Sequence, residues 1–279
     1  MEKVIVKVPA KVNLTLDVTG EKGGFHTIKS LVASISLYDV ITLSKREDKK
    51  VTLACSGIDA LCPTEENNAY KTACAVVKEF GLNGVDILLE KSIPVGAGLG
   101  GSSADIAGVL KGMQQLYQIE GDLTGLANSL GSDVAFMLKG GWAVIEGKGE
   151  KITPVKPRRK LFLLILTADQ SVGAGECYKK FDEQAKIYPP ATDKAVRILL
   201  DGDEWGFLES LKNDLYNSAR EILPQIEKNL GVLLLHGDAF MTGSGSATVG
   251  VYTSLYERNK VYKELHPVFG KKLIKAMTL

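Results

Sequence analysis

Cysteine is scarce in this 279-residue chain, which contains Cys55, Cys62, Cys74 and Cys177. None of the four stands in a C-x-x-C spacing or beside a histidine. This pattern argues against a disulfide framework and against a zinc site. We expect buried or incidental thiols in a reducing compartment.

The chain also lacks an excess of either charge, since 34 basic residues face 33 acidic ones for a net charge of +1. A protein that binds nucleic acid or a membrane surface normally carries a basic patch. The densest basic cluster, Lys156 to Lys160, is interpreted as a solvated linker. Small molecules are therefore the expected partners, with no nucleic acid and no membrane.

Long apolar runs are missing as well. The longest notable one, Leu161 to Leu166, is far shorter than the roughly 20 residues that span a bilayer. The segment Met1 to Val8 lacks the apolar core and cleavage site of a signal peptide. The predicted location is cytoplasmic.

With 45% hydrophobic and 24% charged residues, the composition is that of a globular protein with a substantial core. Alternating and β-branched residues predict strands, and apolar residues three or four apart predict helices. The predicted strands are 4–8, 12–18, 31–43, 51–54, 85–89, 142–146, 161–166 and 248–252, and the predicted helices are 69–80, 103–117 and 123–130. This order favours a mixed α/β, or α+β, fold. A break at Pro154 to Lys160 predicts two domains, 1–155 and 156–279.

The most informative stretch, Pro94 to Asp105, joins a predicted strand to a predicted helix through a loop with glycines at 96, 98, 100 and 101. Glycines let backbone N–H groups converge on one point, and Ser102 suits the N-cap of the helix that follows. The N-terminus of a helix attracts anions. Nucleotide phosphate is the first ligand to consider.

Two other interpretations of this loop are open. Gly96, Gly98 and Gly101 satisfy the G-x-G-x-x-G pattern of a dinucleotide-binding turn. That fold expects a second strand ending in an acid about 20 residues later, where this chain has Glu120 to Asp122 at an apparent junction of helices. The second interpretation is a glycine-rich turn that only changes the direction of the chain. No G-K-[ST] ending is present, so a Walker A loop is excluded.

A second stretch, Lys11 to Asp17, alternates polar with apolar residues, so Lys11 and Asn13 should share the polar face of a strand. An ordinary half-exposed strand would look the same. The turn that follows brings Phe25 and His26 to the end of this strand.

Two more stretches complete the pattern. In the segment 128–138, Ser132 can cap a short helix and Asp133 would lie in its first turn, where an acid also serves as a simple capping residue. The segment Met241 to Ala247 is a second glycine-serine loop, ahead of a predicted strand.

Together these four stretches resemble the GHMP small-molecule kinases. The motifs that carry the resemblance are Pro9 to Leu16, Gly24 to His26, Pro94 to Ser103, Gly131 to Phe136 and Met241 to Gly245, with Asn213 to Leu215 as a further match. The resemblance covers most of the chain and implies a two-domain fold with the active site in the cleft between domains. It also implies ATP-dependent phosphoryl transfer to an alcohol, with Mg²⁺. Within the family, the closest pattern implies the 2-hydroxyl of 4-diphosphocytidyl-2-C-methyl-D-erythritol as acceptor, in non-mevalonate isoprenoid precursor biosynthesis.

The resemblance also implies roles for single residues. Asp133 would accept or orient the proton of the attacking hydroxyl, and Lys11 would keep Asp133 ionised. The residues implied to hold ATP are Pro94, Gly96, Ala97, Gly98, Leu99, Gly100, Gly101, Ser102, Ser103 and Asn67, with Asn68 beside the last. The residues implied to contact the acceptor are Asn13, Phe25, His26, Tyr178, Gly243 and Ser244. Phe25 and Tyr178 would stack on the cytosine ring.

The chain departs from the family pattern at Gly23, Phe25, Gly173 and Ala174, all on the nucleobase side. A related kinase with a different acceptor is therefore an alternative, and so is a nucleotide-binding protein without catalytic activity. A monomer and a homodimer are both compatible with the sequence.

Overall fold

The computed structural model describes residues 2–58, 64–121, 123–184 and 188–279. The chain folds into two compact units, each built from several segments. Unit 1 comprises Met1–Ala10, Leu37–Val95 and Gly100–Gly140, and unit 2 comprises Lys11–Ser36, Gly96–Leu99 and Gly141–Leu279. Cys62 and Asp122 lie outside the described residues.

The segments of both units follow from two long strands, β1 (Lys3–Asn13) and β3 (Phe25–Lys45), whose residues are divided between the units. Residues 11–36 and 141–155 therefore belong to the same compact unit as the C-terminal part of the chain. The division into domains 1–155 and 156–279 stays a prediction, because compact units and family domains are defined differently.

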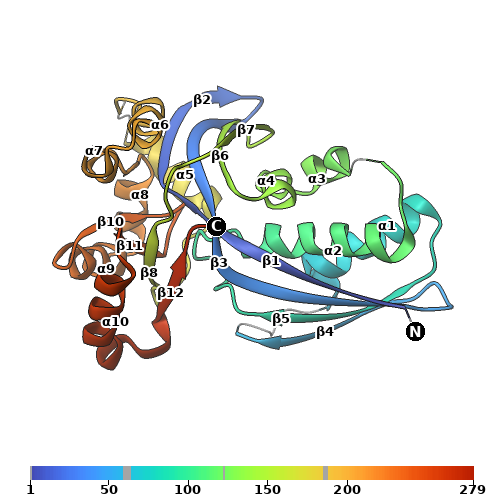
Figure 1. The fold of residues 1–279 in the computed structure, drawn as a ribbon. Coiled ribbons are helices and arrows are strands. Elements are labelled where there is room, and N and C mark those ends of the chain that lie inside the picture. The colour runs from blue at the N-terminus through green and yellow to red at the C-terminus, as the bar shows by residue number, and fades with distance from the viewer. Residues whose placement is uncertain (1, 59–63, 122, 185–187) are drawn as a thin grey trace. The chain divides into compact units, whose positions relative to one another are not determined.

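Unit 1 combines part of a sheet with four helices (Figure 1). In its sheet, β5 pairs antiparallel with β3 and parallel with β4. Helix α2 lies close to this sheet, since a Cβ on Gly108 would collide with Ile41 and one on Gly112 with Leu43. The further elements of unit 1 are β4 (Val51–Gly57), the short 3₁₀ helix η1 (Thr64–Glu66), α1 (Asn68–Phe80), β5 (Val85–Lys91), α2 (Gly101–Tyr117), α3 (Thr124–Leu130) and α4 (Val134–Lys139).

Unit 2 begins with a hairpin of β2 (Thr15–Lys22) and β3, joined by Gly23 and Gly24. Both glycines have positive φ, +60° and +73°, as a type I′ turn requires. Strand β3 also pairs with β6 (Trp142–Gly147), which pairs with β7 (Lys151–Val155). Pro154 is tolerated in β7 because, among the described residues, this strand pairs with β6 alone.

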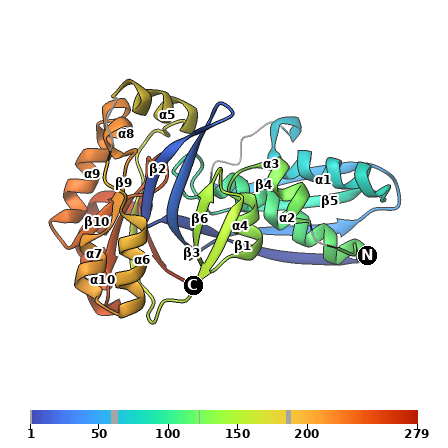
Figure 2. The ribbon, with the colours of Figure 1, turned by 90° about the horizontal axis from the view of Figure 1, so that it is seen from above.

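A second sheet of unit 2 is antiparallel, in the order β10, β11, β8, β12. Helices α9 and α10 cover this sheet (Figure 2), and their Leu233, Val261 and Leu265 form a core with Leu164 of β8. The elements of this part are β8 (Phe162–Leu166), α5 (Ala174–Glu183), α6 (Thr192–Asp201), α7 (Glu204–Glu209), β9 (Lys212–Asn213), α8 (Tyr216–Ile222), α9 (Gln225–Leu234), β10 (Asp238–Met241), β11 (Thr248–Tyr252), α10 (Leu255–Phe269), the 3₁₀ helix η2 (Gly270–Lys272) and β12 (Leu273–Met277).

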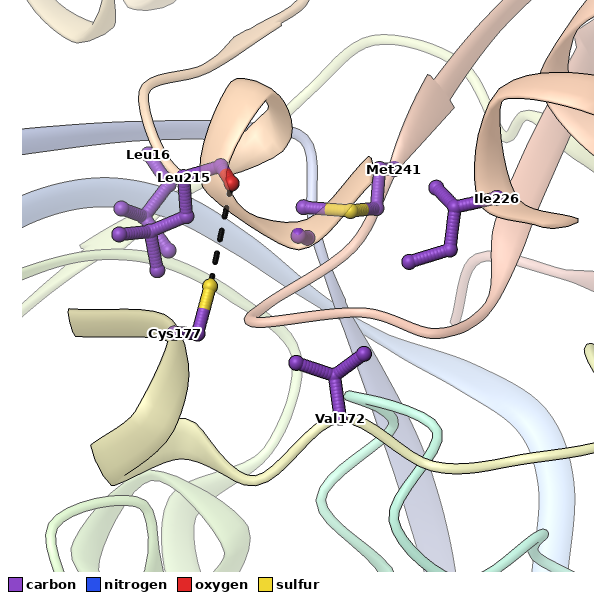
Figure 3. Packing of buried hydrophobic residues seen from close by; sticks show 7 residues of the cluster. Leu16, Val172, Cys177, Leu215, Ile226 and Met241 are labelled. Carbon is purple, nitrogen blue, oxygen red and sulfur yellow. Dashed lines mark hydrogen bonds between the residues drawn. The ribbon is translucent and has the colours of Figure 1, made fainter. Parts of the chain in front are cut away.

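A further core of unit 2 joins segments that are far apart in the sequence. Leu16 of β2 packs with Cys177 of α5, Leu215 and Met241 (Figure 3). The Cys177 thiol lies 3.8 Å from the Leu215 carbonyl oxygen, and burial raises the pKa of this thiol to about 12. Cys177 is therefore a buried thiol, as expected.

The mixed α/β fold is confirmed, and most predicted elements have their counterparts. The predicted strand 12–18 is wrong in one respect, because the chain leaves the strand conformation at Leu14 between β1 and β2. Strand β7 was not expected, since Pro154 suggested a break. Among the described residues, no helix combines the length and the apolar character needed to cross a membrane.

Candidate active site

The glycine loop connects β5 to α2, with positive φ at Gly96, Gly98 and Gly100 of +65°, +76° and +74°. A Cβ on Gly98 would fall on the carbonyl oxygen of Thr242, so no side chain fits there. The second glycine-serine loop is held against this one, because Ala247 N–H donates to the Ala97 carbonyl oxygen at 3.1 Å. Two loops that are 144 residues apart, as measured between Gly98 and Thr242, thus support each other within unit 2.

Helix α2 begins at Gly101, with Gly100 as the capping residue in the left-handed conformation. The prediction that Ser102 caps this helix is therefore wrong, because a glycine already supplies the turn. The Ser102 hydroxyl instead accepts a hydrogen bond from the Asn68 amide. The N–H groups in the first turn of a helix have no acceptor within the helix, so this end of α2 suits an anion.

Lys11 lies near the end of β1, and its backbone N–H donates to the Leu99 carbonyl oxygen at 3.0 Å. Its side chain is only 5% exposed, and Nζ donates to Oδ1 of Asn13 at 2.5 Å. The two side chains therefore share a face, as the alternation predicted. The alternative of an ordinary half-exposed strand does not hold, since Asn13 is 2% exposed and its backbone N–H donates to the Thr242 hydroxyl at 2.9 Å.

The orientation of the Asn13 amide follows from Ser30 of β3. The Ser30 hydroxyl donates its only proton to the Thr15 carbonyl oxygen at 2.5 Å, so it can only accept from Nδ2 of Asn13, at 2.8 Å. The amide oxygen Oδ1 must then face Lys11. Ser30, which was not predicted as a site residue, thus orients the amide of Asn13 and, through it, Lys11.

Asp133 occupies the N-cap position of α4, where its side chain makes no capping hydrogen bond. The expectation that Ser132 caps this helix with Asp133 in its first turn is off by one residue. Gly131 lies near Ser103, since a Cβ on Gly131 would be 3.8 Å from the Ser103 hydroxyl oxygen. Asp133 belongs to unit 1 and Lys11 to unit 2, and the pairing of their side chains stays a prediction.

The His26 ring packs against side chains of α5. Its ring stacks on Tyr178 with centroids 4.6 Å apart, and Nε2 lies 2.8 Å from Oδ1 of Asp182. Phe25 is 63% exposed and lies under the Lys148 ammonium, 4.1 Å from the ring centroid. His26 therefore covers one face of the Tyr178 ring, whereas the Phe25 ring contacts Lys148.

Asn213 organises the second glycine-serine loop. Its Nδ2 donates to the carbonyl oxygens of Met241 and Gly243, both at 2.8 Å, and its Oδ1 accepts from Leu215 N–H. Gly243 is one of the two residues of this loop that were predicted to contact the acceptor. The other, Ser244, is half-buried and comes next in the chain. The turn Asn213 to Leu215 therefore stabilises the second glycine-serine loop through the Asn213 side chain.

Asn67 is the N-cap of α1, where Oδ1 accepts from Ala69 N–H at 2.8 Å. Its Nδ2 lies 3.8 Å from the Cys55 sulfur. The side chain predicted to lie near ATP therefore also stabilises the start of a helix.

Known proteins that are similar to this chain include kinases. A family model described as the GHMP kinases N terminal domain matches residues 67–141. A 4-diphosphocytidyl-2-C-methyl-D-erythritol kinase of Caldicellulosiruptor saccharolyticus is 33% identical, over 99% of this chain and 97% of its own length. The chain belongs to the GHMP kinase family.

Two further matches extend this assignment. A kinase of the same name from Alkaliphilus metalliredigens is 32% identical, over 95% of this chain and 93% of its own length. A crystal structure of 4-(cytidine 5'-diphospho)-2C-methyl-D-erythritol kinase has a TM-score of 0.81 and 29% identity, covering 99% of this chain and 100% of that one. The resemblance to the GHMP kinases is confirmed, and the chain is an ATP-dependent phosphotransferase.

A homoserine kinase from Cytophaga hutchinsonii shares the fold of this chain, with a TM-score of 0.75 and 19% identity over 100% of this chain and 95% of that one. The dinucleotide-binding alternative does not hold. Helix α2 ends at Tyr117 and α3 begins at Thr124, and the described residues between them form no strand.

Unit 1 of this GHMP kinase also contains a buried charged cluster that was not predicted from the sequence. Nζ of Lys91 lies 2.5 Å from Oδ2 of Asp39 and 2.7 Å from Oδ2 of Asp105. A signal was present, because Asp39 falls inside a predicted apolar strand and Asp105 lies one helical turn before Val109, on the apolar face. Charges in such positions need partners, since an unpaired buried charge is costly.

Proposed function

We propose that this GHMP kinase transfers the γ-phosphoryl group of ATP to the 2-hydroxyl of 4-diphosphocytidyl-2-C-methyl-D-erythritol, as a step in non-mevalonate isoprenoid precursor biosynthesis. The bond between the hydroxyl oxygen and the γ-phosphorus forms, the bond from that phosphorus to the β,γ-bridging oxygen breaks, and ADP leaves. The two relatives at 32–33% identity are named as kinases of this alcohol, and they match this chain over nearly their whole length. The observation that supports the proposal is the hydrogen bond from Lys11 N–H to the Leu99 carbonyl oxygen, which connects the strand that carries Lys11 to the glycine loop.

In this proposal each part has one task. The glycine loop and the first turn of α2 bind the triphosphate, because they present backbone N–H groups and exclude side chains. Asp133 orients the acceptor hydroxyl and receives its proton, and Lys11 stabilises negative charge on the transferring group. Asn13 holds Lys11 in place through the 2.5 Å contact.

Magnesium would enter with ATP, bound to its phosphate oxygens, and would neutralise the charge that develops there. The described residues contain no group of three or more His, Cys, Asp or Glu side chains that could hold a metal ion by themselves. A magnesium ion that is held mainly by the phosphate oxygens of ATP would not need such a group of side chains. The acceptor would lie near Asn13, His26, Gly243 and Ser244, and the kinase would act as a monomer or homodimer in the cytoplasm.

The test is an assay of ADP release by the purified protein with ATP and Mg²⁺. We expect release that depends on added 4-diphosphocytidyl-2-C-methyl-D-erythritol, with phosphorus NMR placing the new phosphate on the 2-hydroxyl. Tight ATP binding without release on addition of this alcohol would reject the proposed acceptor.

A second acceptor remains a candidate because of the contacts on the nucleobase side. Tyr178 stacks on His26, Phe25 stands where the family usually has tyrosine, and Gly173 is the exposed cap of α5. A panel of alcohols with and without a cytidine group distinguishes the two. If Tyr178 stacks on the base, Tyr178→Ala should raise the KM of the cytidylylated alcohol about tenfold and leave the KM of ATP unchanged.

A further inference from the structure

Lys91 and Asp105, which flank the glycine loop in the sequence, form a buried cluster with Asp39 of β3. The side chains of Asp39, Lys91 and Asp105 are 0%, 7% and 8% exposed. Three ionisable groups in such a place are costly to desolvate, so the cluster contributes little net stability. Its presence calls for another explanation.

The contacts of the cluster reach both ends of the glycine loop. Oδ1 of Asp39 accepts from the backbone N–H groups of Ser92 and Ile93, at 2.6 and 2.8 Å, directly before the loop. Asp105 lies in the second turn of α2, the helix that follows the loop, and its Oδ2 accepts from Lys91 Nζ. A Cβ on Gly101 would lie 3.6 Å from the same Nζ.

Lys91 therefore bridges two carboxylates. Asp39 binds the backbone just before the loop, and Asp105 belongs to the helix that follows the loop. Glycines leave the backbone between these two points unusually free, and ordering such a backbone costs conformational entropy on binding. Fixing both ends restricts the loop before any ligand arrives. The charge–charge contacts are short and shielded from water, which makes the bridge rigid.

The charges within the cluster differ in character. Burial raises the pKa of Asp105 to about 7, opposed by Lys91 and assisted by Asp39. Oδ1 of Asp105 has no hydrogen-bond partner in the part of the chain that the structure describes. The hydrogen bond from Lys91 Nζ to Oδ2 therefore ties the Asp105 side chain to the lysine.

We propose that Asp105, through Lys91 and Asp39, is a positioning residue that preorganises the glycine loop and the first turn of α2 for the phosphates of ATP. The inference rests on the proposed role of this loop in ATP binding. It does not depend on which alcohol is phosphorylated. None of the three side chains needs to touch the nucleotide.

The test compares Asp105→Ala with Asp105→Asn, which keeps an oxygen that can accept from Lys91. Lys111→Met is the matched control, because Lys111 is a half-buried lysine of the same helix whose Nζ lies 3.4 Å from the Met137 carbonyl oxygen. Two readouts are taken on the full chain, the Kd of ATP with Mg²⁺ by calorimetry and amide hydrogen exchange over residues 94–104 without nucleotide. Thermal unfolding of each variant shows whether it is folded.

We expect Asp105→Ala to weaken ATP binding about tenfold, the equivalent of one lost hydrogen bond, and to speed exchange in the loop. Asp105→Asn and Lys111→Met should stay within about threefold of the wild type. If Asp105→Ala does not fold, Asp105→Asn combined with Lys91→Met removes the bridge with neutral groups and should show the same loss. Unchanged ATP affinity and loop exchange in a folded variant without the bridge would overturn the inference. Failure of the wild type itself to bind ATP would instead reject the proposed function.

Discussion

The side-chain amide nitrogen of Asn13 donates to the hydroxyl oxygen of Ser30 at 2.8 Å, and this contact determines which end of the amide faces Lys11. Ser30 is fully buried and bonds onward to Thr15, so the hydroxyl has no freedom to rotate. The orientation of the predicted catalytic lysine is therefore set by a serine on a neighbouring strand.

Ser30→Ala should lower kcat about tenfold, the equivalent of one hydrogen bond, because the Asn13 amide can then rotate and release Lys11. The KM of ATP should change little. Steady-state kinetics of ADP release measures both constants.

Ser34→Ala is the matched control for this variant. Ser34 is a fully buried serine four residues further along β3, and its hydroxyl has no hydrogen-bond partner among the described residues. The control should keep wild-type kcat. Equal loss in both variants would mean that the effect comes from packing of β3 and not from the Asn13 contact.

Asp133→Ala should reduce kcat at least about a hundredfold, as expected for a group that positions a hydroxyl and takes its proton. ATP affinity, measured by calorimetry, should be retained. Ser132→Ala, at the exposed neighbouring position, should behave like the wild type. Full activity of the Asp133 variant would favour a nucleotide-binding protein without this chemistry.

The raised pKa of Asp105 predicts a pH dependence of stability. The unfolded carboxyl releases its proton near its ordinary value of 3.8, whereas the folded one holds it up to about 7. Between these values the native state binds the extra proton, so its free energy of unfolding falls as pH rises, by up to about 1.4 kcal/mol per pH unit. Urea unfolding from pH 4 to 8 should show this fall in the wild type and a flatter curve in Asp105→Asn. Parallel curves would contradict the raised pKa.

Burial of Cys177 predicts slow chemical modification, because the thiolate is the reactive form and its pKa is raised to about 12. Iodoacetamide at pH 8 should label the half-buried Cys55 and Cys74 before Cys177, with peptide mapping by mass spectrometry identifying each site. In urea, Cys177 should react like the others. Early labelling of Cys177 in the native protein would indicate that the core of Leu16, Leu215 and Met241 opens readily.

Short-range patterns in the sequence predicted much of this protein correctly. The alternation from Lys11 to Asp17 placed Lys11 and Asn13 on one face, since successive strand side chains point to opposite sides. The glycine loop was placed correctly between a strand and a helix. The capping residue of that helix was wrong, because serine and glycine both favour a helix start and only the φ of +74° at Gly100 distinguishes them.

The sequence by itself determined the fold class, the glycine loop and the family motifs, because each depends on residues that are neighbours along the chain. The tertiary structure decided that Lys11 and Asn13 are buried, and it brings the Thr242 hydroxyl, 229 residues away, to the backbone N–H of Asn13. It also decided that Asp39, Lys91 and Asp105 form one cluster at the ends of the loop. Contacts of this range arise from the packing of whole elements, and a single sequence carries no local pattern for them.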